Sequence, residues 1–252
     1  MYPVLLQIGD FSISSFGVMV ALSFLVAYWL CLKEFRRRGL SEDLLGNLFL
    51  AAMIGGIAGA KLLYLFENVP LKEIIQNPVQ HLFARGGLTF YGGLFGAVLL
   101  TWLVGRRSKL NFWLLGDSVA PAMAIGYSIG RIGCFLVGDD YGTKSDLPWA
   151  MAFPNGLPPT TDTVHPTQIY EALIMFIVFL YLWKIRKDKN KTGYIFSLYL
   201  ILAGSERFII EFLRNTTQSP IPGLSIAQLM AVVIILFGLY KIFSLRSSTS
   251  NT

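Results

Sequence analysis

Residues 126–142, GYSIGRIGCFLVGDDYG, carry most of the information about the fold. They close an apolar run that begins near Phe112, and they contain glycines, Arg131 and the pair Asp139 and Asp140. An arginine at the centre of a bilayer costs at least about 2.5–3.5 kcal/mol, so it usually faces a bundle interior or a polar ligand. Glycines let a backbone or a ligand approach closely. We therefore predict a transmembrane helix that ends at a phosphate-binding site on one membrane face.

The composition of the whole chain agrees with a membrane protein. Its 252 residues are 54% hydrophobic and only 14% charged. This length predicts one compact transmembrane domain over residues 1–252. The net charge is +6, but most lysines and arginines flank apolar runs, as topology signals do, so we expect no nucleic-acid partner. Cys31 and Cys134 lie in apolar runs and define neither a disulfide framework nor a zinc site.

Seven apolar runs have about the length that crosses a ~30 Å hydrocarbon core. They cover residues 14–32, 44–66, 87–104, 112–137, 168–183, 193–213 and 225–243. Residues 67–85 are amphipathic, which favours an interfacial or re-entrant segment. Residues 138–166 are polar and proline-rich, and we expect them to form a small extracytoplasmic cap. The predicted fold class is an all-α polytopic membrane protein with about seven transmembrane helices.

The basic residues predict the orientation of the chain. Most of them follow the first, third, fifth and seventh runs, whereas the opposite loops contain only Lys72, Arg85 and Lys144. The positive-inside rule therefore places the N-terminus outside and the C-terminus in the cytoplasm. Residues 1–10 have no basic n-region, so we predict no cleaved signal peptide. The helix end at Arg131 and the segment 138–166 then face outward.

This topology gathers the polar residues of the apolar runs on one face of the membrane. They are Arg131, His165, Glu171, Arg207, Glu211 and Arg214. In a continuous helix Arg207 and Arg214 would be two turns apart, with Glu211 on the same side. Such a ladder could bind a phosphate bidentately, or it could be a structural ion pair with snorkelling arginines.

Other polar residues and glycines also leave two interpretations open. His165 could be a general base or could orient the helix that begins at Pro166. For Glu171 we favour fixing an arginine over proton transfer. The pair Asp139 and Asp140 could also be a solvated turn. Gly92 and Gly93, like the preceding Gly86 and Gly87, suit helix packing, but in a broken helix they would expose backbone N–H groups to an anion.

Four motifs together resemble the prolipoprotein diacylglyceryl transferase family. They are GGLTFYGGLFGA at 86–97, GRIGCF at 130–135, HPTQIYEA at 165–172 and RFIIEFLR at 207–214. The resemblance implies a bacterial inner-membrane enzyme with its active site toward the outer leaflet. Such an enzyme moves a diacylglyceryl group from phosphatidylglycerol to the lipobox cysteine of a prolipoprotein signal peptide, forming a thioether and releasing glycerol phosphate. The resemblance implies no metal or nucleotide cofactor.

The resemblance also implies roles for individual residues. Arg131 and Arg207 correspond to catalytic arginines and Arg214 to a supporting one, which suits a phosphate leaving group. Tyr91 or His165 would help to deprotonate the acceptor thiol, whose ordinary pKa is ~8.5. The expected substrate-binding residues are Arg131, Arg207, Arg214, Gly92, Gly93, Cys134, Asp139, Gln168, Tyr170, Glu171 and Glu211.

The chain departs from the family pattern on the thiol side of the expected site. Tyr91 stands where many members have a histidine, and Cys134 stands where they have an asparagine. The usual Asn-x-Glu continuation has become Val137, Gly138 and Asp139. Two alternatives to the transferase therefore stay open: a divergent paralogue with another acceptor, and a non-catalytic phospholipid-binding membrane protein.

Overall fold

The computed structural model describes residues 1–9, 11–83, 87, 89–188, 191–214 and 223–247. The chain divides into two compact units. The first unit contains residues 1–31 and 116–252, and the second contains residues 32–115. The single transmembrane domain over 1–252 stays a prediction.

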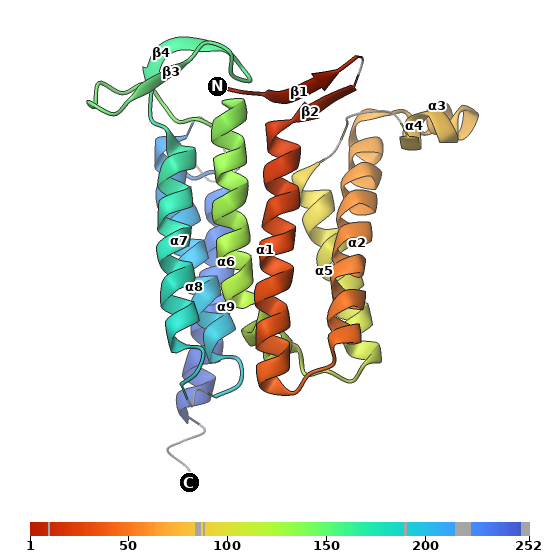
Figure 1. Ribbon diagram of the computed structural model, residues 1–252, viewed down its shortest axis with the longest axis vertical. Coiled ribbons are helices and arrows are strands. Elements are labelled where there is room, and N and C mark those ends of the chain that lie inside the picture. The colour runs from red at the N-terminus through yellow and green to blue at the C-terminus, as the bar shows by residue number, and fades with distance from the viewer. Residues whose placement is uncertain (10, 84–86, 88, 189–190, 215–222, 248–252) are drawn as a thin grey trace. The chain divides into compact units, whose positions relative to one another are not determined.

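Helices dominate the described residues (Figure 1). They are α1 (Ser15–Arg38), α2 (Glu42–Asn68), α3 (Leu71–Gln76), α4 (Pro78–Phe83), α5 (Phe90–Arg107), α6 (Phe112–Val137), α7 (Thr167–Ile185), α8 (Tyr194–Ile210), the 3-10 helix η1 (Glu211–Leu213) and α9 (Ile226–Ser247). Each predicted span overlaps one long helix. Among the described residues, α1, α2, α6, α7 and α9 are long and apolar enough to cross a membrane, whereas α5 and α8 are not among these five. A mostly helical membrane protein is therefore confirmed, and the count of seven spans stays a prediction.

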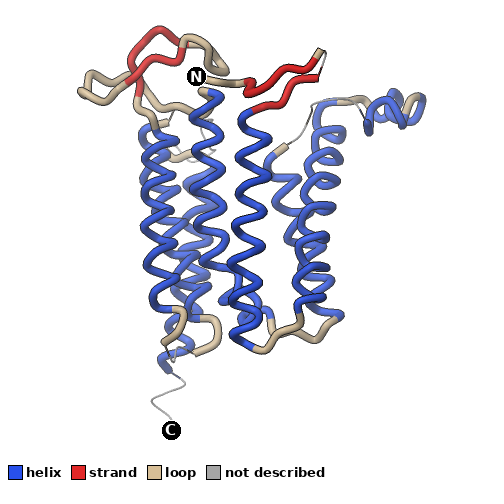
Figure 2. The backbone as a smooth tube through the Cα atoms, in the orientation of Figure 1, coloured by secondary structure: helices blue, strands red, loops and turns tan. Residues whose placement is uncertain are grey.

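Two short antiparallel hairpins were not predicted (Figure 2). The strands β1 (Val4–Ile8) and β2 (Phe11–Ser14) precede α1, with Leu6 opposite Ile13. The strands β3 (Met151–Phe153) and β4 (Thr160–Val164) lie within the segment 138–166. The all-α class is therefore incomplete. Strands of three to five residues contain too few alternating positions to give a period-2 signal.

In the second unit, α2 and α5 pack at backbone distance through glycines. Gly55 and Gly59 of α2 face Gly92 and Gly96 of α5, and a Cβ added to Gly96 would lie 2.9 Å from the Cα of Gly59. Small residues four apart allow this approach in membrane helices. Gly92 therefore lies in a helix-packing contact. The six-residue helices α3 and α4 occupy the predicted interfacial stretch 67–85 and are too short to cross a bilayer.

In the first unit, α6, α7 and α8 share an apolar core. Its buried members are Ala120, Ala124, Met175, Val178, Leu182, Ile195 and Tyr199. At one end of this core the buried carboxylate of Asp117 on α6 accepts hydrogen bonds from the backbone N–H groups of Gly193 (2.6 Å) and Phe196 (2.8 Å). These donors begin α8 and have no partner within the helix. Asp117 thereby fixes the start of α8 against α6, and the far ends of the same helices carry Arg207 and Arg131.

Candidate functional site

Glu171, in the second turn of α7, is the centre of the polar cluster in the first unit. Its side chain is 0% exposed, and it forms ion pairs with Arg131, with Arg214 at 3.4 Å and with Arg207 at 3.8 Å. Tyr127 of α6 donates a hydrogen bond to Glu171 Oε2 at 2.7 Å, and Arg131 Nη2 donates to the Tyr127 hydroxyl at 3.1 Å. The sequence predicted one arginine partner for Glu171, and the fold brings three.

Asp140 joins two of these arginines on the more exposed side of the cluster. Arg131 Nη1 donates to Asp140 Oδ2 at 2.8 Å, and Arg214 Nη2 donates to Asp140 Oδ1 at 2.6 Å. Burial alone would raise the pKa of Asp140, but the charges of Arg214 and Arg131 outweigh it and hold that pKa below its ordinary 3.8. The solvated-turn alternative is thus incomplete for Asp140, because the exposed side chain also pairs with two arginines. Sequence reasoning missed this residue because its partner Arg214 lies 74 positions away.

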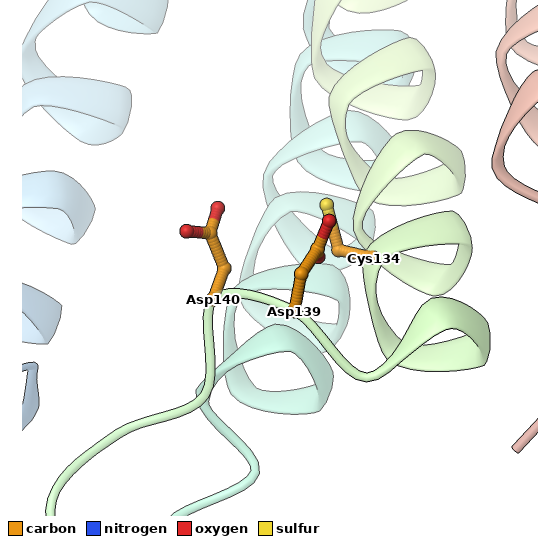
Figure 3. A group of neighbouring side chains, drawn as sticks. All are labelled: Cys134, Asp139 and Asp140. Atoms are coloured by element: carbon orange, nitrogen blue, oxygen red, sulfur yellow. The ribbon is translucent and has the colours of Figure 1, made fainter. Parts of the chain in front are cut away.

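The neighbouring Asp139 faces Cys134 instead (Figure 3). Among the described residues, its buried Oδ1 has no hydrogen-bond partner. Burial raises the pKa of Asp139 above its ordinary 3.8, and the charge of Asp140 raises it further. Ligand atoms of Cys134, Asp139 and Asp140 lie within 4.8 Å of one another, a geometry that could hold a cation. Because Asp140 already pairs with Arg131 and Arg214, whose charges would repel a cation, the geometry of these groups does not favour a cation site.

The predicted Arg-Glu-Arg ladder is present only in part. Arg207 Nη2 lies 2.8 Å from Glu211 Oε2, and Ser225 donates to Glu211 Oε1 at 2.7 Å. The α-helix ends at Ile210, however, and Arg214 follows η1 with an extended backbone. The two-turn spacing of Arg207 and Arg214 on one continuous helix is therefore wrong. Both arginines still contact Glu171, because the 3-10 turn redirects the chain.

The first turn of α7 holds the backbone of the aspartate pair. Thr167 Oγ1 donates to the carbonyl of Asp140 at 2.9 Å, and Gln168 Nε2 donates to the carbonyl of Asp139 at 2.5 Å. Both side chains are 0% exposed. Gln168, a predicted substrate-binding residue, therefore contacts the protein's own backbone, and this contact positions Asp140 next to the arginines.

His165 and Tyr170, two other predicted site residues, contact each other. His165 Nδ1 is 3.4 Å from the Tyr170 hydroxyl, which accepts a hydrogen bond from Trp149 Nε1 at 2.7 Å. Within the described residues, no ion pair or hydrogen bond joins the His165 side chain to an arginine. Tyr91 and Gly93 belong to the first turn of α5 in the second unit, and Tyr91 is 38% exposed. The roles of these residues stay predictions.

Two further residues of the cluster were not predicted. Tyr127 precedes Arg131 by one helical turn, a spacing that could have indicated the contact, and the guanidinium lies 5.1 Å from the centre of its ring. Glu206 is adjacent to Arg207, is only 5% exposed, and its Oε1 has no hydrogen-bond partner among the described residues. A carboxylate inside an apolar run is itself a signal of function.

Comparison with known proteins extends over nearly the whole chain. The family described as prolipoprotein diacylglyceryl transferase matches residues 3–244. A phosphatidylglycerol–prolipoprotein diacylglyceryl transferase of Clostridium tetani is 36% identical, covering 95% of this chain and 96% of that protein. Proteins of the same name from Nitratidesulfovibrio vulgaris (strain DP4) and Photobacterium profundum are 34% and 36% identical, each over 94% of this chain and over 92% and 90% of their own lengths. The chain belongs to the prolipoprotein diacylglyceryl transferase family.

Proposed function

We propose that this protein transfers the diacylglyceryl group of phosphatidylglycerol to the lipobox cysteine of prolipoproteins. The thiolate sulfur forms a bond to the glyceryl carbon while the carbon–oxygen bond to the phosphate breaks. The products are a thioether-linked prolipoprotein and glycerol phosphate. The observation that carries this proposal is the convergence of three arginines on the buried Glu171 at the ends of apolar helices. The names of the relatives support the same reaction.

The geometry suits a reaction whose leaving group is a phosphate. Guanidinium groups bind phosphate oxygens bidentately, and positive charge that is already oriented stabilises the negative charge that develops as the bond breaks. Arg131, Arg207 and Arg214 are 14%, 28% and 10% exposed, so their charges are only partly screened by solvent. Glu171 holds all three in place before substrate arrives. We assign catalysis to Arg131 and Arg207, and phosphate binding to all three.

The acceptor thiol must lose a proton before it attacks. The candidates for the base are Tyr91, which stands where many family members have a histidine, and His165 at the start of the motif HPTQIYEA. Replacing each separately with phenylalanine and measuring the pH dependence of transfer would assign the base. The variant that removes the base should lose the rise of rate with pH, and the other should keep it.

We further propose seven membrane crossings, with the N-terminus outside and the C-terminus in the cytoplasm. The arginine cluster then lies toward the outer leaflet, below a cap formed by residues 138–166. Trp149 is 55% exposed in this segment and suits the membrane–water interface. Cysteine labelling tests this orientation in a background that lacks Cys31 and Cys134. A cysteine introduced at Asp162 should react with an impermeant reagent outside the cell, and labelling only after lysis would overturn the orientation.

The reaction itself is tested with purified protein, labelled phosphatidylglycerol and a lipobox peptide. A thioether product together with glycerol phosphate supports the transferase. Binding of phosphatidylglycerol without transfer favours a phospholipid-binding protein, and transfer to a different thiol or hydroxyl acceptor favours a divergent paralogue.

A further inference from the structure

The carboxylate of Asp140 already occupies an anion position between two arginines of the site. Its two oxygens accept separate hydrogen bonds, at 2.8 Å from Arg131 and at 2.6 Å from Arg214. Two oxygens of a phosphodiester present a similar arrangement to two guanidinium groups. A lipid phosphate therefore has to compete with Asp140 for Arg131 and Arg214.

The backbone at Asp140 is fixed, whereas its side chain has room to move. Asp140 has φ 60°, a left-handed conformation that few non-glycine residues adopt, although aspartate and asparagine tolerate it better than most. Thr167 and Gln168 hold this backbone in place by donating hydrogen bonds to the carbonyls of residues 140 and 139. The Asp140 side chain is 45% exposed. A rotation about χ1 toward solvent would take this side chain away from the arginines while the loop stays in place.

The ion pairs of this cluster show how its charge would change if the Asp140 side chain left the arginines. Arg131, Arg207 and Arg214 form ion pairs with Glu171, Glu211 and Asp140, so the paired charges cancel. Of these three carboxylates, Glu171 and Glu211 are 0% and 2% exposed, whereas Asp140 is 45% exposed. When Asp140 leaves, Arg131 and Arg214 keep only Glu171 as a described ion-pair partner, so the positive charge that is available to an anion rises by one.

We propose that Asp140 is an internal competitor for the phosphate position. It keeps Arg131 and Arg214 oriented and charge-compensated in the empty site, and it rotates outward when the phosphodiester enters. After transfer, it returns to the arginines and displaces glycerol phosphate. This proposal rests on the proposed function for the identity of the phosphate, but the competition itself concerns any phosphate that reaches the two arginines.

The test compares lipid and product binding in matched variants. Asp140→Asn removes the charge but keeps a side chain that tolerates the left-handed backbone. Asp140→Gly removes the side chain and suits φ 60° even better, so it replaces the first variant if that one fails to fold. The control is Asp162→Asn, which removes an exposed aspartate paired with Lys144 in the same segment. Calorimetry in detergent measures the Kd of short-chain phosphatidylglycerol and of glycerol phosphate.

Both Asp140 variants should bind the two ligands more tightly than wild type, by about two- to fivefold, which is the range expected for removing a partly exposed competing ion pair. The control should bind as wild type does.

Unchanged or weaker binding in the Asp140 variants would overturn the proposal and assign Asp140 a purely structural role. Absence of binding in every protein would also overturn the proposal. Tighter binding in a protein that transfers no diacylglyceryl group would support the competition and reject the proposed function. Diacylglyceryl transfer by wild type without tighter binding in the Asp140 variants would support the proposed function and reject the competition.

Discussion

Replacing Glu171 with glutamine tests whether one buried carboxylate organises the arginine cluster. The substitution keeps the shape of the side chain and an oxygen that accepts from Tyr127 or Arg131, but it removes the charge that three arginines share. Removing one partner of a buried ion pair typically costs about 3–5 kcal/mol. Here the cost is lower, because Asp140 still pairs with Arg131 and Arg214, and Glu211 still pairs with Arg207. We expect a loss of about 2–3 kcal/mol in the free energy of unfolding.

Denaturant unfolding in detergent measures this loss, and Glu42→Gln is the matched control. Glu42 also pairs with an arginine, Arg36, but the two side chains are 51% and 61% exposed. Exposed pairs contribute little to stability because solvent screens them, so the control should differ little from wild type. If Glu171→Gln were as stable as the control, the arginines would not depend on Glu171.

The Glu171→Gln variant also tests whether the arginine cluster binds anions. Without the Glu171 charge, the three arginines carry one more uncompensated positive charge, so inorganic phosphate should raise the Tm of Glu171→Gln more than that of wild type. Equal stabilisation of both proteins by phosphate would refute the view that these arginines form an anion site.

Three further substitutions test the framework and the loop beside the site. Asp117→Ala should lower the free energy of unfolding by about 1–3 kcal/mol, because the first N–H groups of α8, including that of Gly193, lose a buried acceptor; no change in thermal unfolding would contradict this. Gly96→Ala should cost about 1–3 kcal/mol, because its Cβ would meet the carbonyl of Gly55, and wild-type stability would show that α2 and α5 can separate at little cost. Burial raises the pKa of Asp139, so its contribution to stability is lost as the pH rises through that pKa. Asp139→Asn should therefore gain about 1 kcal/mol or less at pH 7, because the charge is partly buried, and this gain should fade toward pH 4; an equal difference in Tm at both pH values would contradict it.

The sequence predicted the long helices well because a bilayer demands about 20 apolar residues in a row, and this requirement leaves a strong pattern. The ends of α6, α7 and α8 could also be assigned to one side, since successive spans alternate in direction. That reasoning brought Arg131, Glu171 and Arg207 together before any contact was known.

The details that the sequence did not predict depend on tertiary contacts. Asp140 looks like a turn residue until the fold places it between Arg131 and Arg214. The end of α8 at Ile210 has no proline or glycine to mark it, so a continuous helix through Arg214 was the simplest extrapolation. The strand pair within 138–166 is stabilised by pairing across a loop rather than by a repeating pattern.

The most direct test of the proposed phosphate site compares Arg131→Ala with Arg36→Ala. Both the affinity for phosphatidylglycerol and the rate of diacylglyceryl transfer are measured. Arg36 is a matched arginine that pairs with Glu42 outside the site. We predict that wild type and Arg36→Ala convert labelled phosphatidylglycerol and a lipobox peptide to the thioether, and that Arg131→Ala loses at least about 100-fold in rate, as expected when a group that stabilises transition-state charge is removed. Its affinity for phosphatidylglycerol should fall as well. Full transfer by a folded Arg131→Ala protein would contradict the assignment of the phosphate to this arginine cluster.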